Sequence, residues 1–415
     1  MDFDDAPDEA AFREEARAWL DSVAKRRGDG DGSWRRFRAK NEEDDAAQVA
    51  TAKAWQAKLQ TEGWAGLHWP EAFGGRGLSP DIAGVFTEER THYDVPANFF
   101  MIGIDMVGPT LMAHGTTEQQ QRYLLPMLRG EETWCQLFSE PGAGSDLASL
   151  ATRAVRDGDG WVVTGQKVWT TWADQSELAM LLARTDPSAP KHQGLTYFVL
   201  DLRQPGVEVR PLRQITGEAE FNEVFLDAAR VPDAHRIGEV NAGWSVSAAT
   251  LSSERQMISG SGSGGIGRLG GVAADRLIDL ARERGRWTDP VVRDAIMRLW
   301  AEEQVRAMTN ARVRSATAAG VSPGPAASIG KVHQASLNQR IQSAVVDLVG
   351  IDAIAWDADR EDMPAEIRGL LRSLANSIEG GTSEVNKNVL GERVLGLPRE
   401  PDPWRGRPWE EVPRS

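Results

Sequence analysis

The stretch QLFSEPGAGSD, from Gln136 to Asp146, separates two parts of the chain that differ in hydrophobic periodicity. Before it, apolar residues recur three or four positions apart, as in Phe12, Ala16 and Leu20, which is typical of helices. After it come short segments rich in β-branched and aromatic residues, divided by turn residues, which predict strands. The Pro and Gly residues of SEPGAGSD force an irregular loop. We expect its N–H groups to stay free for a polar ring edge or a phosphate, although an ordinary turn fits as well.

The periodicity divides the chain into three domains and a tail. An N-terminal helical domain is expected over residues 1–131, a middle β domain over 132–238 and a C-terminal helical bundle over 239–398. The Pro- and charge-rich residues 399–415 are expected to be extended. Turns such as RDGDG (156–160) favour antiparallel pairing of the strands, so the predicted fold class is α+β.

Composition disfavours several classes of protein. With 41% hydrophobic and 26% charged residues, the chain has the balance of a globular protein, and its net charge of −14 argues against nucleic acid as a partner. No apolar run approaches the ~20 residues that span a bilayer, and the acidic start is unlike a signal peptide, so a cytoplasmic protein is expected. Cys135 is the single cysteine and the His residues lack metal-ligand spacing, so neither a disulfide nor a metal site is expected.

A glycine-rich segment, GSGSGGIG from Gly260 to Gly267, matches the G-x-G-x-x-G pattern of dinucleotide-binding loops. That pattern binds a pyrophosphate only as the turn from a strand into a helix. The preceding SAATLSSERQMIS has a helical pattern. We therefore interpret the glycines as small residues that allow close helix packing, with a dinucleotide loop as the less favoured alternative.

A second aromatic segment, VWTTW from Val168 to Trp172, follows on a predicted strand. Alternation along a strand would place Trp169 and Thr171 on one face, which would offer an aromatic wall and a hydroxyl donor together. The alternative is an ordinary core strand.

The order of motifs along nearly the whole chain resembles the acyl-CoA dehydrogenase family. The motifs are SEPGAGSD, GQKVWTT, NEVFLDAARVP, an ER dipeptide in the C-terminal helices, GGTSE and ERVLGLPR. The resemblance implies an N-terminal helical domain, an antiparallel β-barrel-like middle domain and a C-terminal helical bundle, with FAD between the last two. It also implies that the α-proton and β-hydride are removed from an acyl-CoA thioester.

The resemblance assigns FAD contacts to two groups of residues. Those at the flavin ring and the pyrophosphate are Gln136, Phe138, Ser139, Gly144, Ser145, Trp169, Thr170 and Thr171. Those of the adenine side, at a subunit boundary, are Arg284, Trp287, Asp347, Gly350, Thr382 and Glu384. The second group departs from the family pattern, because Thr288 replaces a Gly and Asp347 stands where Gln is usual.

The catalytic base is expected on a helix of the C-terminal domain. Many family members place a Glu directly before G-T-S, but SIEGGTSEV has Gly380 there, and Glu379, one place early, would point about 100° away on a helix. Other members, resembling isovaleryl-CoA dehydrogenase, use a Glu followed by Arg, and LSSERQM supplies Glu254 as the base. The N–H of Gly380 would bond the thioester carbonyl. The expected substrate contacts are Ser145, Leu251, Arg255 and Gly381.

Partners follow from the same resemblance. They are an acyl-CoA substrate, an electron-transfer flavoprotein as acceptor, and further copies of the chain in a homotetramer or dimer, with a heterotetramer as the alternative. Two other functions stay open: dehydrogenation of a carrier-protein-bound or specialised acyl group, and a non-catalytic subunit of a heteromeric dehydrogenase. A non-catalytic subunit need not keep both flavin motifs and a base candidate, whereas this chain keeps all three.

Overall fold

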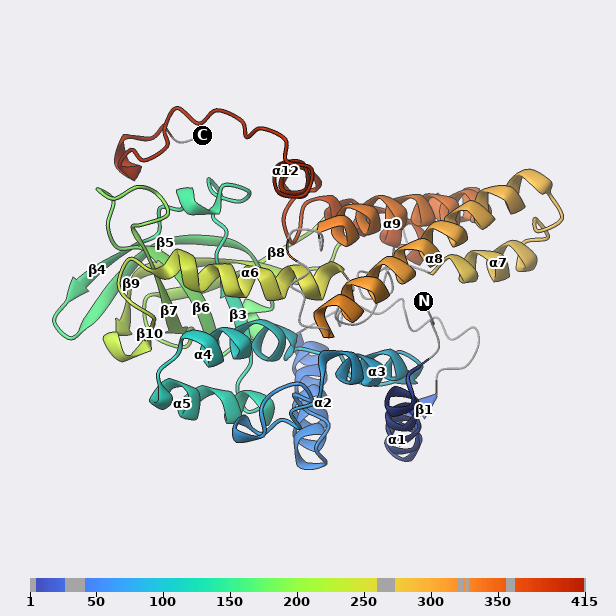
Figure 1. The fold of residues 1–415 in the computed structure, drawn as a ribbon, viewed down its shortest axis with the longest axis horizontal. Coiled ribbons are helices and arrows are strands. Elements are labelled where there is room, and N and C mark those ends of the chain that lie inside the picture. Colours follow the sequence, from blue (N-terminus) through green and yellow to red (C-terminus); the bar gives the residue numbers. More distant parts are fainter. Residues whose placement is uncertain are drawn as a thin grey trace.

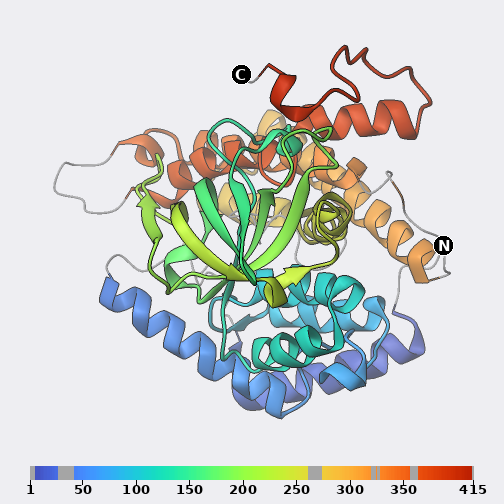
Figure 2. The ribbon, with the colours of Figure 1, turned by 90° about the vertical axis from the view of Figure 1, so that its left-hand side faces the viewer.

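The protein, as a computed structural model, is described over residues 5–26, 42–259, 273–318, 324, 328–355 and 363–413. A β-sheet lies in the middle, with the N-terminal helices on one side of it and the C-terminal helices on another (Figures 1 and 2). The glycine-rich segment Gly260–Gly267 lies outside the described residues. Among the described helices, none combines the length and apolarity needed to cross a bilayer.

The N-terminal helices enclose an aromatic core. The helices are α1 (Pro7–Val23), α2 (Glu42–Thr61), α3 (Pro80–Arg90), α4 (Gly108–His114) and α5 (Thr117–Leu128). The predicted periodicity of the first helix is confirmed, since Phe12, Ala16 and Leu20 are all buried. Trp64 stacks between Trp19 and Phe86, with ring centroids 5.0 and 4.9 Å away.

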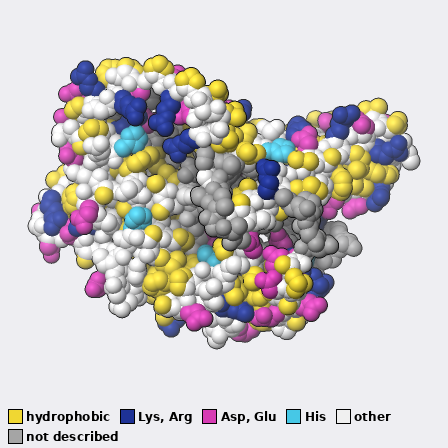
Figure 3. All heavy atoms as spheres, viewed as in Figure 1, with side chains coloured by type: hydrophobic (Ala, Val, Ile, Leu, Met, Phe, Trp, Pro, Cys, Tyr) yellow, Lys and Arg dark blue, Asp and Glu magenta, His cyan; other side chains and the backbone are white. Residues whose placement is uncertain are grey.

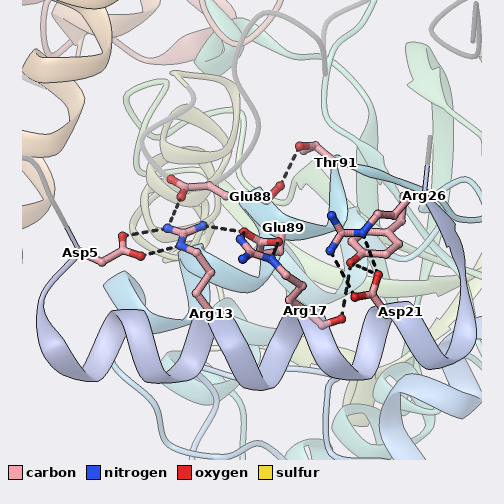
Figure 4. Close-up of polar contacts among 9 residues, drawn as sticks. Asp5, Arg13, Arg17, Asp21, Arg26, Glu88, Glu89 and Thr91 are labelled. Atoms are coloured by element: carbon pink, nitrogen blue, oxygen red, sulfur yellow. Dashed lines mark hydrogen bonds and ion pairs between the residues drawn. The ribbon is translucent and has the colours of Figure 1, made fainter. Parts of the chain in front are cut away.

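Buried charge joins α1 to α3. Arg13 and Arg17 of α1 both reach Glu89, at 3.2 and 2.9 Å, and the Glu89 side chain is almost fully buried (Figure 4). Asp5 and Glu88 accept hydrogen bonds from the Nε and NH2 of Arg13. Two guanidinium groups therefore compensate one desolvated carboxylate and fix the angle between the helices.

The middle domain is one eight-stranded sheet, with strand order β10-β7-β6-β4-β5-β9-β8 and β3 paired to β6. The strands are β3 (Trp134–Leu137), β4 (Arg153–Asp157), β5 (Gly160–Thr171), β6 (Leu178–Arg184), β7 (Leu195–Asp201), β8 (Val207–Leu212), β9 (Phe221–Pro232) and β10 (Arg236–Ile237). A short pair, β1 (Lys25–Arg26) and β2 (Tyr93–Asp94), lies apart from it. Most pairings are antiparallel as expected, but β3 and β4 both pair in parallel with β6.

Strands β6 and β7 are buried on both faces, which explains their nearly continuous apolar sequence. Met180 and Leu182 face the N-terminal core, whereas Ala179 and Leu181 face a second core, which is made by side chains of the middle-domain strands. Cys135 also lies in this second core, fully buried, and burial raises the pKa of its thiol. It is a packing residue.

The C-terminal helices form a bundle with a protruding arm (Figure 1). The helices are α6 (Gly243–Ser259), α7 (Ala274–Glu283), α8 (Pro290–Ala318), α9 (Ser328–Val349), α10 (Ile351–Ile354), α11 (Ala365–Ser373) and α12 (Ser383–Arg393). Helix α6 runs beside the sheet and contacts β7, and α7, α8 and the end of α9 make the arm.

The tail returns from α12 to the β domain, so it is extended only in part (Figure 1). Its short helix, Trp409–Glu411, docks beside the β6–β7 loop, where Trp409 N–H donates to Ala189 O at 2.9 Å. The indole Nε1 of Trp409 donates to Ser149 O at 3.1 Å, and the Arg184 guanidinium lies 4.3 Å from the ring centroid. Specific contacts therefore anchor the end of the tail.

Candidate active site

The candidate site is centred on a contact between Gln136 of β3 and Glu254 of α6. Gln136 Nε2 donates to Glu254 Oε2 at 3.3 Å, which joins two predicted site residues 118 positions apart. On β3, Gln136 is half-buried while Trp134, Cys135 and Leu137 are buried, so its amide is the part of the strand that can reach a neighbour. Glu254 is also half-buried.

The loop after β3 is partly closed by its own hydrogen bonds. Glu140 and Ala143 exchange both backbone bonds, at 2.9 and 3.0 Å, so the expectation of free N–H groups is wrong for these two residues. Gly144 and Ser145 are exposed, and a Cβ at Gly144 would meet nothing within 4 Å. The outer half of the loop therefore faces open space.

Lys167 supports the inner half of this loop. Its ammonium is fully buried and donates to Phe138 O, Leu182 O and Glu140 Oε1, each at 2.9 Å. Phe138 is itself buried, edge-on to Tyr197, so only its backbone can meet a ligand. Lys167 was not among the predicted site residues, although a Lys within the apolar alternation of β5 indicates a buried cation.

The VWTTW segment departs from a regular strand. A bulge separates Lys167 from Thr170, and Trp169 takes a left-handed backbone conformation with φ of 61°. The indole of Trp169 is 56% exposed and packs edge-on against Phe221. Thr171 is half-buried, whereas the Thr170 hydroxyl is buried with no hydrogen-bond partner among the described residues. The burial of these three residues fits the predicted common face of Trp169 and Thr171, although the bulge interrupts the regular strand before it.

Two consecutive glycines follow Glu379 in left-handed conformations. The φ angles are 63° at Gly380 and 86° at Gly381, a region that side chains with a Cβ rarely adopt. Glu379 itself accepts from Asn376 Nδ2 at 2.7 Å and pairs with Arg372 at 3.0 Å. The carboxylate that sequence reasoning set aside as a base is thus held in an ion pair.

A buried lysine of α9 lies near both carboxylates of the region. Lys331 is 2% exposed and its ammonium donates to Asn376 O. Burial lowers its pKa, while the charges of Glu379 and Glu254 oppose that shift. Neither Lys331 nor Arg372 was among the predicted site residues, because a single Lys or Arg on a helix carries no signal of its burial.

The predicted adenine-side residues divide into two places. Arg284, Asp347 and Gly350 are exposed around the tip of the arm, where Arg284 pairs with Asp352 at 3.3 Å, and Trp287 is half-buried beside them. Figure 1 shows this tip far from β3. A single chain therefore does not join these four residues to the flavin side.

The remaining predicted residues lie close to the turn or on α6. Thr382 caps α12 by accepting from Val385 N–H at 3.1 Å, and Glu384 is exposed on the first turn. Leu251 is half-buried against the N-terminal core. Arg255 is on α6, but its side chain lies outside the described residues.

Comparison with known proteins supplies the family. Residues 6–131 match the acyl-CoA dehydrogenase N-terminal domain, residues 135–229 the middle domain and residues 241–395 the C-terminal domain. The chain belongs to the acyl-CoA dehydrogenase family. This acyl-CoA dehydrogenase is 39% identical over 354 residues to acyl-CoA dehydrogenase IpdE1 of Mycobacterium tuberculosis, covering 84% of this chain and 88% of that protein.

Two solved structures of the family share the fold. The Tcur3481-Tcur3483 steroid ACAD has a TM-score of 0.80 and 27% identity, covering 96% of this chain and 100% of that one. The ChsE4-ChsE5 complex from Mycobacterium tuberculosis has a TM-score of 0.75 and 27% identity, with the same coverage. The predicted fold class and the oxidoreductase class, acyl-CoA dehydrogenase, are confirmed. The residue roles, and the subgroup with its base on a C-terminal-domain helix, stay predictions.

Proposed function

We propose that the chain removes hydrogen from the α and β carbons of an acyl-CoA thioester to give the 2-enoyl-CoA, with Glu254 as the base. The observation that carries this proposal is the 3.3 Å contact between Gln136 and Glu254. It puts a carboxylate beside the strand that resembles the flavin-binding strand of the family. Abstraction of an α-proton needs a carboxylate within reach of the reacting carbon, and this is the position where one is available.

FAD is the cofactor that we propose, and the residues around this contact fit its ring. Trp169 presents a large exposed indole that could cover a flat ring, and Thr171 lies next to it, half-buried. Gln136 and Ser139 supply half-buried polar groups for the pyrimidine edge. Gly144 leaves room above the loop for a pyrophosphate. When bound, FAD would supply the acceptor for the β-hydride.

The residues of the chain then have distinct roles. Glu254 takes the α-proton, and its charge opposes the lowering of the Lys331 pKa by burial. The N–H of Gly380 is proposed to bond the thioester carbonyl as negative charge develops there. Leu251, Ser145 and Gly381 would line the substrate channel, as would Arg255.

We also propose that the FAD site is completed by a second chain. Arg284 and Trp287 lie on the arm, away from β3, so in a single chain they cannot reach FAD bound at Gln136. The arm exposes apolar side chains that a subunit contact would cover, and Figure 3 shows yellow atoms gathered along it. On α8 these are Val291, Met297, Trp300, Val305 and Met308. Either a homotetramer or a heteromer fits, and the ChsE4-ChsE5 structure is a complex of two named proteins.

The proposed substrate class is a bulky acyl-CoA of steroid type, with an electron-transfer flavoprotein as acceptor. The support is similarity to a structure named as a steroid ACAD at 27% identity over 96% of the chain. A carrier-protein-bound substrate is the alternative within the same chemistry.

A second candidate function is that of a non-catalytic subunit in a heteromeric dehydrogenase. It is favoured by Gly380 at the usual position of the base and by the separation of the arm residues from β3. A chain of this kind would not bind FAD by itself.

One experiment separates these functions. The chain is purified alone, supplied with FAD, and titrated without oxygen with short, long, branched and steroid-type acyl-CoAs while flavin absorbance is followed. Bleaching by any of them supports the dehydrogenase, and the preferred ester identifies the substrate class. A colourless protein that takes up no FAD would contradict a homo-oligomeric dehydrogenase, and would leave the non-catalytic subunit and an active subunit whose FAD site needs a different chain.

A further inference from the structure

Arg372 of α11 is held between carboxylates of two domains. Its Nε lies 3.2 Å from Oε1 of Glu220, the residue directly before β9 in the middle domain, and its NH2 lies 3.0 Å from Glu379 Oε2 in the C-terminal domain. Only 11% of the Arg372 side chain is exposed, and Glu220 is buried as well. The pair is therefore shielded from solvent, where a guanidinium fork fixes geometry more strongly than it does on a surface.

The Glu220 side of this bridge continues into the VWTTW segment. The carbonyl oxygen of Glu220 accepts from Trp172 N–H at 2.9 Å. Two residues later, Asn222 Nδ2 donates to Thr170 O at 3.1 Å. A change in the position of Glu220 would consequently be passed to the backbone that presents Trp169.

The Glu379 side continues into the two left-handed glycines. Gly380 and Gly381 follow Glu379 directly, so their N–H groups move with its backbone. Asn376 Nδ2 donates to the other oxygen of Glu379, and Asn376 O in turn accepts from Lys331. Glu379 is therefore fixed on three sides: by Arg372, by Asn376 and by the chain itself.

We propose that Arg372 is a positioning residue, which sets the separation between the wall that carries Trp169 and the turn that carries Gly380. The inference rests on the proposed function, since those are the proposed flavin and thioester sides of the site. The Arg372 guanidinium bonds both Glu220 and Glu379. In the described part of the chain, no other side chain bonds both of these carboxylates. Without it, the buried Glu220 would lose its cation and Glu379 would keep only the bond from Asn376, so the two sides could move apart.

The test compares Arg372→Gln with a matched control on the same helix. Arg368 lies one turn earlier on α11 and pairs with Glu218 of the same β-domain loop at 2.8 Å, but no hydrogen bond or ion pair of the described residues joins it to Glu379. Arg372→Gln should lower kcat on the order of 10²-fold, the effect expected of a misplacement of about 1 Å, while FAD stays bound. Arg368→Gln should keep kcat within about twofold of wild type, because the pair of Arg368 with Glu218 lies on the β-domain side alone and does not connect it to the Gly380 turn.

Three further measurements distinguish a positioning role of Arg372 from a general loss of structure. Arg372→Lys keeps the positive charge but not the guanidinium fork, so kcat should still fall at least about tenfold. This variant replaces Arg372→Gln in the test if the Gln variant does not fold. Glu379→Gln should also lower kcat, and the double variant should lose less than the two single losses combined, because both variants weaken the Arg372–Glu379 contact. Amide exchange should rise in residues 169–172 and 378–382 for Arg372→Gln and stay unchanged for Arg368→Gln.

The proposal is overturned if Arg372→Gln and Arg372→Lys keep wild-type kcat, if Arg368→Gln falls as far as Arg372→Gln, or if exchange in the two segments does not change. If the flavin of the wild-type protein bleaches with none of the acyl-CoAs, the proposed function is contradicted instead. In that case the exchange measurement, which needs neither cofactor nor substrate, decides the positioning role by itself.

Discussion

Several residues of this protein have structural roles that their residue type alone does not predict. Lys167 is a cation inside a sheet, and it holds the inner half of the SEPGAGSD loop through Glu140. Burial opposes ionisation of Glu140, but the charge of Lys167 and the N–H groups of Ala151 and Thr152 outweigh it and keep the pKa of Glu140 below its ordinary value. The stability from this pair is therefore present above the ordinary Glu pKa and is lost as the pH falls through the lowered one.

Loss of the Lys167 ammonium should lower the free energy of unfolding far more than loss of an exposed cation that pairs with the same loop. Lys167→Met leaves Glu140 buried and unpaired, so the free energy of unfolding should fall by about 3–5 kcal/mol. Lys191→Met removes the exposed pair with Asp146 and should cost at most about 1 kcal/mol. Denaturant titration of both variants measures the difference. Equal losses would contradict the structural role given to Lys167.

Trp169 shows where residue-level prediction from sequence reached its limit. The aromatic wall could be expected from VWTTW, but the left-handed backbone that exposes the indole could not, because it depends on the register of β5 against β9. A strained conformation of this kind costs roughly 1–3 kcal/mol and is typical of ligand sites.

At the scale of elements, local periodicity predicted most helices and strands, while pairing and docking depended on distant partners. The helical spacing of Phe12, Ala16 and Leu20 and the RDGDG hairpin needed only neighbouring residues. The parallel pairing of β3 with β6 could not be read from either strand. The docked tail could not be foreseen either, since Trp409 bonds Ser149, 260 positions earlier.

The tail should be released by loss of one anchor. Trp409→Ala removes the stacking on Arg184 and the bond to Ser149, so limited proteolysis should cleave after residue 398 sooner than in wild type. Trp404→Ala is the matched control, because Trp404 is an exposed tryptophan of the same tail and should leave the cleavage rate unchanged. Faster cleavage in the control, or none in Trp409→Ala, would argue against the anchor.

At the scale of the whole molecule, the chain places its predicted FAD residues at two separate sites. The sequence could name Arg284 and Trp287 by resemblance, but it could not reveal that the arm carries them away from β3. Our proposal that both groups of residues contact one FAD therefore needs a neighbouring subunit, in keeping with the apolar surface of α8.

A charged side chain on the arm should weaken both the association of the subunits and the binding of FAD. Val305→Asp puts a carboxylate on the exposed apolar face of α8, so light scattering should report a smaller species and the bound FAD per chain should drop. Val155→Asp makes the same change at a similarly exposed position of β4, away from the arm, and should alter neither. An unchanged oligomer with Val305→Asp would remove the support for a shared FAD site.

The central claim, that Glu254 is the base, is tested most directly by Glu254→Gln in the FAD-loaded protein. The side chain keeps its shape and its neighbour Gln136 but loses the ability to take a proton, so flavin should stay bound and fail to bleach with an acyl-CoA without oxygen. Glu239→Gln, an exposed carboxylate just before α6, should bleach like wild type. Normal bleaching of Glu254→Gln would contradict the account and place the base elsewhere.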